Sequence, residues 1–430
     1  MSGYLPRMDN IVSNKLGRLK LISLIIGFVG LVIAGYGLFQ GLSQDDSRLV
    51  YSWLIGFSVW FSISIGMFFT LMIWHVFDAG WPVIIRRQVE HAMAFFPWLG
   101  LIFLPLLLIC WFGPNPGILW DWMNPDLVPV GGHTSVGHDP LYLNKAGLLN
   151  LPFFTVRVIC YFLVYWFLTA KLRKHSFQMD VDKNLGHVRA NRVYAAIGIP
   201  VVALLTTLAS VDFFMSLTYE WFSTMYGVWF FATSMRAGLA MVVLICAILA
   251  TYGYLRGVFT RSHLYLLGCM FLAFTVFWAY ITFCQYFLIY NANVPEETFW
   301  YNVRELTAEG GKSSWWWLSL FGLIFAYFLV PFIALLFYKI KVVVRLMVVV
   351  SCWILLFFVT DLYFNILPAK IVADNALGYA IQPFTITVWD LAAIIGMGGI
   401  WVWSFLTSMV KAQPIPINDP RIEESLHAHE

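Results

Sequence analysis

Charged residues are scarce in this 430-residue sequence: Asp, Glu, Lys and Arg make up 11% of it, and the formal net charge is +3. Globular chains contain about 25% charged residues, so this composition excludes a soluble enzyme and a disordered chain. The small net charge also argues against nucleic acid as a partner. Apolar residues dominate instead. Hydrophobic residues reach 60% and aromatic residues 18%, which is typical of a membrane protein with aromatic side chains at the membrane interfaces.

Motifs for redox and catalytic chemistry are also missing. Each of the six cysteines stands alone in an apolar run, which argues against an iron–sulfur cluster, an attached c-type haem and a zinc site. A bis-histidine haem b is disfavoured because His75 is the one histidine near the interior of an apolar stretch. There is no dinucleotide-binding fingerprint, P-loop or nucleophile elbow. We therefore expect that this chain binds no cofactor or metal of its own.

Ten apolar stretches are each long enough to cross a bilayer, which takes about 20 residues in a helix. The runs are continuous rather than alternating, so they predict an all-α membrane protein and not a β-barrel. We expect spans at 20–42, 49–77, 92–112, 151–170, 193–217, 227–255, 263–290, 314–338, 342–367 and 387–409. The chain then divides into an N-terminal segment (1–19), a membrane domain (20–409) and a C-terminal tail (410–430).

The distribution of Lys and Arg predicts the orientation. If the ten spans alternate from a cytoplasmic N-terminus, the cytoplasmic segments contain 19 of the 26 basic residues and the outer segments contain five. The other two, Arg157 and Arg236, fall within spans. This asymmetry obeys the positive-inside rule, so both termini are expected in the cytoplasm. Three outer loops (113–150, 291–313 and 368–386) are long enough to dock a partner, and a basic inner loop is expected at 171–192.

Ionisable side chains inside spans cost roughly 2.5–3.5 kcal/mol each on insertion scales, so each one needs a partner, water or a function. They fall into an inner group, formed by His75 and Asp78 on one helix face, and an outer group. The candidate residues of a proton path are His75, Asp78, Arg157, Asp212, Glu220, Arg236, Tyr280, Asp361 and Asp390. The alternative is structural: Arg157 and Arg236 pair with Asp212, Asp361 or Asp390 and hold helices together.

Three segments carry a resemblance to a known family. They are SVDFFMSL at 210–217, YEWFSTMYG at 219–227 and YFLIYNANVPEET at 286–298. On a chain of ten spans, they resemble the NrfD-like (polysulfide reductase membrane-anchor) family, and within it the ActF subunits of alternative complex III. That complex is a quinol:cytochrome c (or other high-potential acceptor) oxidoreductase of bacteria. The similarity covers nearly all of the chain.

The resemblance implies two four-helix bundles, formed by spans two to five and six to nine and flanked by the first and last spans. It implies a location in the bacterial cytoplasmic (inner) membrane, within an electron-transport chain. The implied partners are a paralogous NrfD-like membrane subunit, an iron–sulfur subunit, and multihaem and monohaem cytochrome c subunits. These partners would hold the haem c groups and iron–sulfur clusters, with menaquinol or another quinol as substrate of the complex. In this family the quinol site is usually placed in the paralogous subunit, and a proton path has been suggested through this one.

The function expected from the sequence is therefore that of a membrane subunit without a redox cofactor, which scaffolds the complex and conducts protons. Two alternatives remain open. One is a proton-coupled secondary transporter, although the charges lie off-centre and no inverted repeat is evident. The other is a purely structural membrane anchor.

Overall fold

The computed structural model describes residues 11–129, 134–307, 309–375 and 378–428. Within them, ten helical segments are long and apolar enough to cross a membrane, as the sequence predicts. In chain order the spans are α1 (Ile11–Gln44), α2 (Ser47–Val76), α3–η1–α4 (Val83–Ala92, Met93–Phe95, Phe96–Phe112), α6 (Leu151–Asp182), α7 (Gly186–Phe213), α8 (Tyr226–Thr251), α9 (Arg261–Ala292), α11–η6–α12 (Ser314–Trp317, Leu318–Leu329, Val330–Leu336), α14 (Val344–Ile366) and α15 (Val388–Met409).

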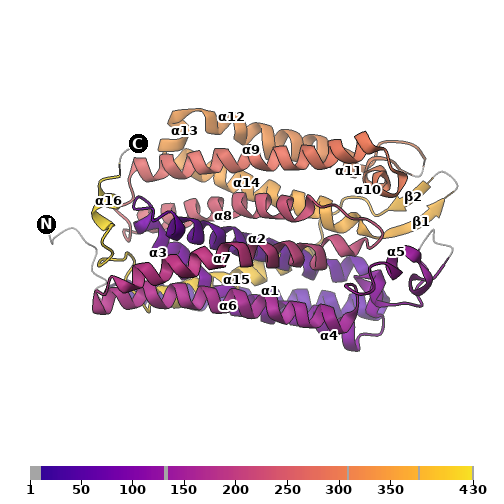
Figure 1. Cartoon of the computed structure of the whole chain (residues 1–430), viewed down its shortest axis with the longest axis horizontal. Coiled ribbons are helices and arrows are strands. Elements are labelled where there is room, and N and C mark those ends of the chain that lie inside the picture. Colours follow the sequence, from indigo (N-terminus) through magenta and orange to yellow (C-terminus); the bar gives the residue numbers. More distant parts are fainter. Residues whose placement is uncertain (1–10, 130–133, 308, 376–377, 429–430) are drawn as a thin grey trace.

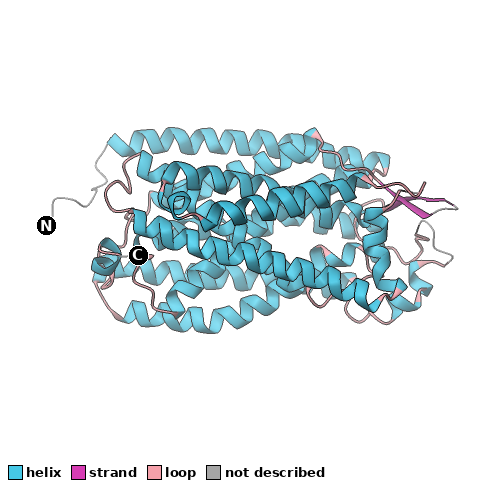
Figure 2. Cartoon of the chain, turned by 90° about the horizontal axis from the view of Figure 1, so that it is seen from above, coloured by secondary structure: helices cyan, strands magenta, loops and turns pink. Residues whose placement is uncertain are grey.

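Short elements gather at the two ends of this elongated bundle (Figures 1 and 2). One end, here called the terminal end, carries the start of α3, α13 (Tyr338–Val342) and α16 (Ile422–Leu426). The other, the loop end, carries η2 (Pro116–Ile118), η3 (Asp121–Met123), η4 (Val136–His138), α5 (Pro140–Leu143), η5 (Met215–Leu217), α10 (Pro295–Glu305), η7 (Leu367–Ala369), β1 (Ile371–Asn375) and β2 (Gly378–Ile381). The two strands form an antiparallel hairpin in which Ile371 pairs with Ile381.

The spans form two four-helix bundles. The first contains α2, α3–α4, α6 and α7, and the second contains α8, α9, the η6 segment and α14. The bundles meet along α2 and α8, which are the most buried spans because both have neighbours on every side. Their backbones cross so closely that a Cβ added at Gly66 would lie 1.8 Å from the carbonyl oxygen of Ser234. The expected architecture of two bundles is therefore confirmed.

The first and last spans, α1 and α15, pack against each other and against α2. A Cβ added at Gly30 would lie 2.5 Å from the Cα of Gly396, so small residues are needed at this crossing, as is common between membrane helices. The two helices flank the bundles, as the family resemblance implies.

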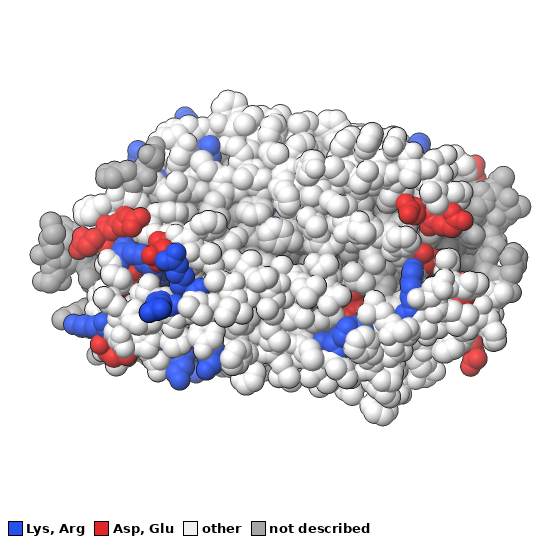
Figure 3. Space-filling view, in the orientation of Figure 1, with Lys and Arg blue, Asp and Glu red and all other residues white. Residues whose placement is uncertain are grey.

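The surface is divided in the way a bilayer requires. Lys, Arg, Asp and Glu side chains gather at the two ends, and most of the surface between them is uncharged (Figure 3). Large apolar side chains within the spans, such as Phe28, Leu163 and Phe283, are more than half exposed. Apolar side chains at that exposure are stable in lipid and costly in water. The protein is an integral membrane protein with multiple spans.

Several boundaries predicted from the sequence are wrong at the terminal end. The expected loop 171–192 is helical over most of its length, since α6 continues to Asp182 and α7 begins at Gly186. The third span begins at Val83 rather than at residue 92. Of the expected N-terminal segment, residues 1–10 lie outside the described residues, and α1 begins at Ile11. Charged residues interrupt the apolar pattern in these helical turns, so hydropathy does not reveal them. In α3 the buried Arg86 and Arg87 are paired with Asp419 and Asp180.

The tail after α15 folds back across the terminal end. Ile415 is 1% exposed. The Gln88 side chain donates to the carbonyl oxygen of Pro414 at 2.5 Å, and the Asn418 side chain donates to that of Asp180 at 2.8 Å. The Ser425 hydroxyl donates to the carbonyl oxygen of Trp81 at 2.7 Å, so the tail packs on this chain as far as Ser425. Residues 429–430 lie outside the described part.

The eighth span departs from α-helical geometry. Residues Leu318–Leu329 form a π-helix, which ends just before Pro331. Proline has no N–H, so it leaves the carbonyl groups before it without their helical donor. Two side chains take that place: Arg236 donates to the Tyr327 carbonyl oxygen at 2.6 Å, and Trp353 donates to that of Ala326 at 2.7 Å. Long π-helical segments are rare, and shorter ones often mark functional sites.

Candidate functional site

The second bundle contains a buried acid and a buried base that are not directly paired. Asp361 on α14 is 1% exposed, and its Oδ2 accepts hydrogen bonds from Thr233 at 2.9 Å and Trp278 at 3.0 Å. Arg236 on α8 is fully buried and stacks on the ring of Tyr327, 3.8 Å from its centroid. Among the described residues, no carboxylate lies within ion-pair distance of Arg236, and two of its nitrogens lack a hydrogen-bond partner. An acid held by neutral donors near a cation can exchange a proton without breaking an ion pair.

Asp361 borders a large cavity. The cavity has a volume of about 520 Å³ and is walled by α9, α10, the π-helix and α14. Aromatic side chains dominate the wall, among them Trp278, Trp300 and Phe328. Its polar groups include Gln285, whose amide nitrogen donates to the Tyr301 hydroxyl at 3.3 Å. A cavity of this size, mostly apolar with a few convergent polar groups, is typical of a ligand site.

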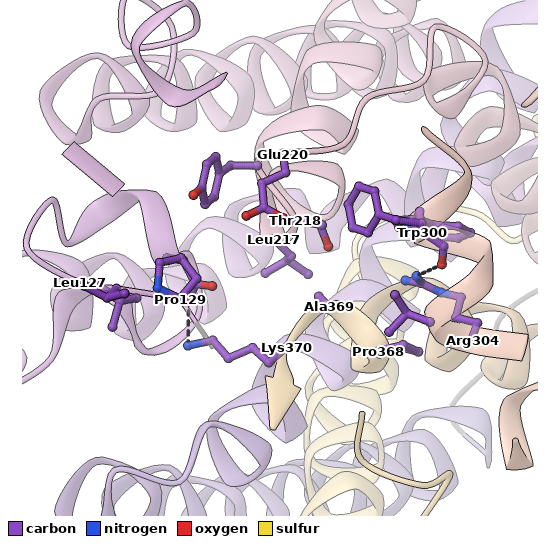
Figure 4. A pocket seen from close by; sticks show the side chains of 15 residues that line it. Leu127, Pro129, Leu217, Thr218, Glu220, Trp300, Arg304, Pro368, Ala369 and Lys370 are labelled. Carbon is purple, nitrogen blue, oxygen red and sulfur yellow. Dashed lines mark hydrogen bonds and ion pairs between the residues drawn. The ribbon is translucent and has the colours of Figure 1, made fainter. Parts of the chain in front are cut away.

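Arg304 and Trp300 on α10 separate this cavity from a smaller one at the loop end. The smaller cavity, about 140 Å³, is lined by both residues and also by Glu220 and Lys370. Figure 4 shows Trp300 and Arg304 on one side of it and Lys370 on the other. The Arg304 guanidinium lies over the Trp300 ring, 3.3 Å from its centroid. The stacked side chains of Trp300 and Arg304 therefore form a wall that the two adjacent cavities share.

Glu220 lies in the loop that follows η5 and is half-buried in the smaller cavity. Burial raises the pKa of the Glu220 carboxyl above its ordinary value, and the nearby charges of Asp139 and Asp121 raise it further. A carboxyl with a raised pKa can hold a proton nearer to neutral pH than usual. Glu220 is thus suited to receive or release a proton at the loop end.

Two other predicted acids form tight ion pairs. Asp212 on α7 accepts two hydrogen bonds of 2.8 Å from Arg157 on α6, and a third of 2.6 Å from the Tyr161 hydroxyl. Asp390 at the start of α15 accepts bonds of 3.0 and 2.6 Å from Arg48 on α2. Bidentate pairs of this kind fix geometry as well as charge. They brace neighbouring helices, as the structural alternative predicts for Arg157 and Asp212.

The terminal end contains a second buried network, centred on Glu90 of α3. Glu90 is fully buried, and its carboxylate contacts Arg86 at 3.1 Å, Arg87 at 3.3 Å and the Ser176 hydroxyl at 2.6 Å. His75 lies 3.9 Å from the same carboxylate. This network therefore places a carboxylate and an imidazole beneath the surface of the terminal end.

The tail completes this network from outside. Asp419 contacts Arg86 at 2.5 Å and Arg421 at 3.0 Å. Arg421 also pairs with Asp78. Burial favours a higher pKa for the Asp419 carboxyl, but Arg86 and Arg421 outweigh it and hold the pKa below its ordinary range. Asp78 is thus tied to the tail, whereas His75 faces Glu90.

The structure places the predicted site residues in separate environments. Asp361 and Arg236 share one environment, Glu220 lies in the smaller cavity, and the other predicted acids, Asp212 and Asp390, belong to the two ion pairs. Tyr280 on α9 is 60% exposed and lies apart from these groups. His75 and Asp78 lie at the terminal end, and of the two only His75 contacts Glu90 directly. The expected outer cluster is therefore divided among separate helix pairs.

Sequence reasoning missed several residues of these sites. The network around Glu90 uses Arg86 and Arg87, which the sequence places in a connecting segment because charged residues interrupt the apolar pattern. Arg304 was expected in an outer loop, yet it is 2% exposed between two cavities. One available signal was the helical spacing of Arg86 and Glu90, four residues apart, which favours an ion pair.

Among the described residues, no group of three His, Cys, Asp or Glu side chains is arranged to hold a metal ion. The six cysteines are all free thiols. The expectation that this chain binds no cofactor stays a prediction.

No protein-family model matches the chain, and no curated protein matches it either. The resemblance to the NrfD-like family therefore rests on the residues quoted above, together with the arrangement of the spans that it implies.

Proposed function

We propose that this chain is the ActF-like membrane subunit of an alternative complex III, a bacterial quinol:cytochrome c (or other high-potential acceptor) oxidoreductase. The three segments at 210–217, 219–227 and 286–298 support this proposal, as does the arrangement of two bundles with flanking first and last spans. In this proposal the chain lies in the cytoplasmic membrane with both termini inside, an orientation supported by the distribution of its basic residues.

The partners follow from the same proposal. They are a paralogous NrfD-like membrane subunit, an iron–sulfur subunit, and multihaem and monohaem cytochrome c subunits. The haem c groups and iron–sulfur clusters belong to these partners, and a quinol such as menaquinol is the substrate of the complex. This chain contributes helices and proton-exchanging groups, and no redox centre of its own.

One observation carries the proposed role in proton conduction. Asp361 is buried beside Arg236 and is held by neutral donors, whereas Asp212 and Asp390 are each locked in a bidentate pair with arginine. A carboxylate paired with arginine cannot exchange a proton without disrupting its ion pair, whereas a carboxylate held by neutral donors can take up and release one. Glu90 with His75 near the terminal end and Glu220 near the loop end would extend the path in the two directions.

The ion pairs favour a second candidate function, that of a purely structural anchor. Arg157–Asp212 and Arg48–Asp390 both join neighbouring helices, and such braces need no transported proton. The two functions differ at Asp361, because an anchor has no need of an exchangeable proton there.

Purification tests membership of the complex. The full chain, tagged at its C-terminus and extracted in a mild detergent, is expected to co-purify with c-type cytochromes and to show their absorbance bands. An equally tagged, unrelated multi-span protein from the same membrane is the control. Recovery of the chain as a solitary protein without haem absorbance, from membranes that contain the cytochromes, would contradict the proposal and favour the transporter alternative.

A further inference from the structure

The terminal end of the second bundle carries a group of basic side chains where α13 packs against α9 and α14. This group, here called the basic cluster, consists of Arg261 at the start of α9, Lys339 and Lys341 in α13, and Arg345 in the first turn of α14. The sequence contains no Asp or Glu from residue 221 to 295 or from 310 to 360. The elements that form this end of the bundle therefore supply no counter-charge.

Lys341 is buried although it has no acidic partner. It is 7% exposed, and its stem packs on Gly268 of α9, where an added Cβ would lie 2.8 Å from the Cγ of the lysine. Its Nζ lies 4.9 Å from the centroid of the Tyr265 ring and 3.8 Å from Sγ of Cys269. A ring face and a thiol are weak partners for an ammonium group, and a buried charge is costly unless it is paired. The position of Lys341 therefore favours a bound anion.

The tail brings acidic residues to the same end of the molecule, but they do not neutralise the basic cluster. The Ser425 hydroxyl of α16 lies 3.2 Å from Nε2 of His263, near the start of α9. The neighbouring Glu423 and Glu424 are exposed. Among the described residues, no carboxylate forms an ion pair with any member of the cluster. An anion from outside the described chain would thus meet four positive charges and no bound competitor.

Exposed apolar side chains lie directly beside the cluster in the chain. α13 connects two spans, and Leu336, Phe337 and Tyr338, which precede Lys339, are 54%, 60% and 52% exposed. The Tyr338 ring packs against the Tyr265 ring of α9, with 5.3 Å between their centroids. Tyrosine is enriched where a membrane meets water. The cluster therefore lies at the level of the lipid headgroups, with a surface for acyl chains next to it.

We propose that the basic cluster binds the phosphate of an anionic phospholipid, with the buried Lys341 and the exposed Lys339 and Arg345 supplying the positive charge. Basic pockets at the ends of membrane helices recognise anionic headgroups in this way. A soluble phosphate compound matches the charge but leaves the apolar side chains of residues 336–338 uncovered, so the observations favour the lipid. The site is separate from the cavity beside Asp361, and the proposal does not depend on the proposed function.

The test uses the full chain in detergent, stripped of lipid and with whichever partners remain attached to it. Phosphatidylglycerol is titrated in, and native mass spectrometry measures the dissociation constant of the first lipid bound. We expect phosphatidylglycerol to bind about tenfold or more tightly than phosphatidylcholine with the same acyl chains. Lys341→Met keeps a long side chain over Gly268 and removes its charge, so it should weaken the binding of phosphatidylglycerol about fivefold.

A second variant keeps the test decisive if Lys341→Met fails to fold. Lys339→Gln with Arg345→Gln changes two exposed side chains and should weaken the binding of phosphatidylglycerol about tenfold or more. Its matched control is Lys174→Gln with Arg189→Gln, two exposed basic residues of α6 and α7 at the same end of the molecule, which should leave the dissociation constant unchanged. An equal loss in the control would assign the effect to net charge and overturn a specific site, and so would unchanged binding in the second variant.

A competition experiment distinguishes a lipid from a soluble phosphate compound. Inorganic phosphate in millimolar excess, at constant ionic strength, should leave phosphatidylglycerol bound, because it cannot replace the contacts of the acyl chains. Full displacement by inorganic phosphate would assign the cluster to a soluble anion and contradict the lipid proposal, as would equal affinity for phosphatidylglycerol and phosphatidylcholine. Failure of these tests would leave membership of the complex intact, because co-purification with cytochromes is measured separately.

Discussion

Arg236 donates a hydrogen bond of 2.6 Å to the carbonyl oxygen of Tyr327, four residues before Pro331. Proline cannot supply the amide donor that this carbonyl would receive in an α-helix. The same guanidinium also stacks on the Tyr327 ring. A gap in the backbone bonding of one helix is thus filled by a charged side chain from its neighbour, and this contact places Arg236 beside Asp361.

Replacing Pro331 should change the eighth span. Pro331→Ala restores an N–H, so we expect residues around Tyr327 to return towards α-helical bonding and Arg236 to lose its carbonyl acceptor. A density map of the variant complex would show the change. Pro105→Ala, in the unrelated helix α4, is the matched control. A π-helix that persists unchanged in Pro331→Ala would show that proline does not cause it.

Arg48 and Asp390 should contribute to the stability of the fold as a coupled pair and not as two independent residues. Asp390→Asn leaves the Arg48 charge buried without its full partner, and breaking a buried pair in this way costs about 3–5 kcal/mol. Replacing both residues with apolar ones of similar volume, Arg48→Met with Asp390→Leu, should recover much of that loss. Thermal unfolding of the purified protein measures both. Additive losses in the double variant would contradict a coupled brace.

The tail should loosen in acid. Because Arg86 and Arg421 hold the pKa of Asp419 below its ordinary value, this carboxylate stabilises the folded tail above the unfolded pKa of about 3.9. That stabilisation is lost as the pH falls through the lower, folded pKa. Hydrogen exchange of residues 410–428, expressed relative to the intrinsic rate at the same pH, should therefore accelerate at strongly acidic pH. In Asp419→Asn it should already be fast at neutral pH, and equal exchange in the two proteins would refute this role.

The ionised carboxylate of Glu220, unlike that of Asp419, should destabilise the fold. Its pKa is raised by burial and then by Asp139 and Asp121, so ionisation opposes folding as the pH rises from the unfolded pKa, about 4.3, through the folded one. Glu220→Gln removes this penalty. The variant should gain thermal stability relative to the unaltered chain at neutral pH, and the gain should shrink in acid. A gain that does not depend on pH would contradict the assignment.

The positions of the spans follow from the sequence because hydropathy depends on residues that are close in the chain. The start of α3 is not predictable in this way, since its buried Arg86 and Arg87 pair with Asp419 and Asp180, which are distant in sequence. Side-chain depth is also predictable, and it places Asp212, Asp361 and Asp390 correctly near the loop end.

Which helix face a side chain occupies is not predictable in the same way. For this reason the acids of one expected cluster become two ion pairs, with Arg48 and Arg157, and two acids, Asp361 and Glu220, that form no ion pair with a described residue. Arg48 illustrates the point: the sequence places it in an outer segment, but the structure pairs it with Asp390 across two helices. The cavity beside Asp361 also escapes prediction, because it arises from the packing of a π-helix against two bundle helices and α10.

The most direct test of the central claim is the number of protons translocated per electron by the complex in proteoliposomes, with quinol as donor and a soluble cytochrome as acceptor. Asp361→Asn keeps the shape of the side chain and removes its exchangeable proton. The control is Asp126→Asn, at an exposed residue of the loop end. The account predicts continued electron transfer with a lowered ratio in Asp361→Asn and an unchanged ratio in Asp126→Asn. An unchanged ratio in fully assembled Asp361→Asn complexes would contradict proton conduction through this chain and leave it a structural anchor.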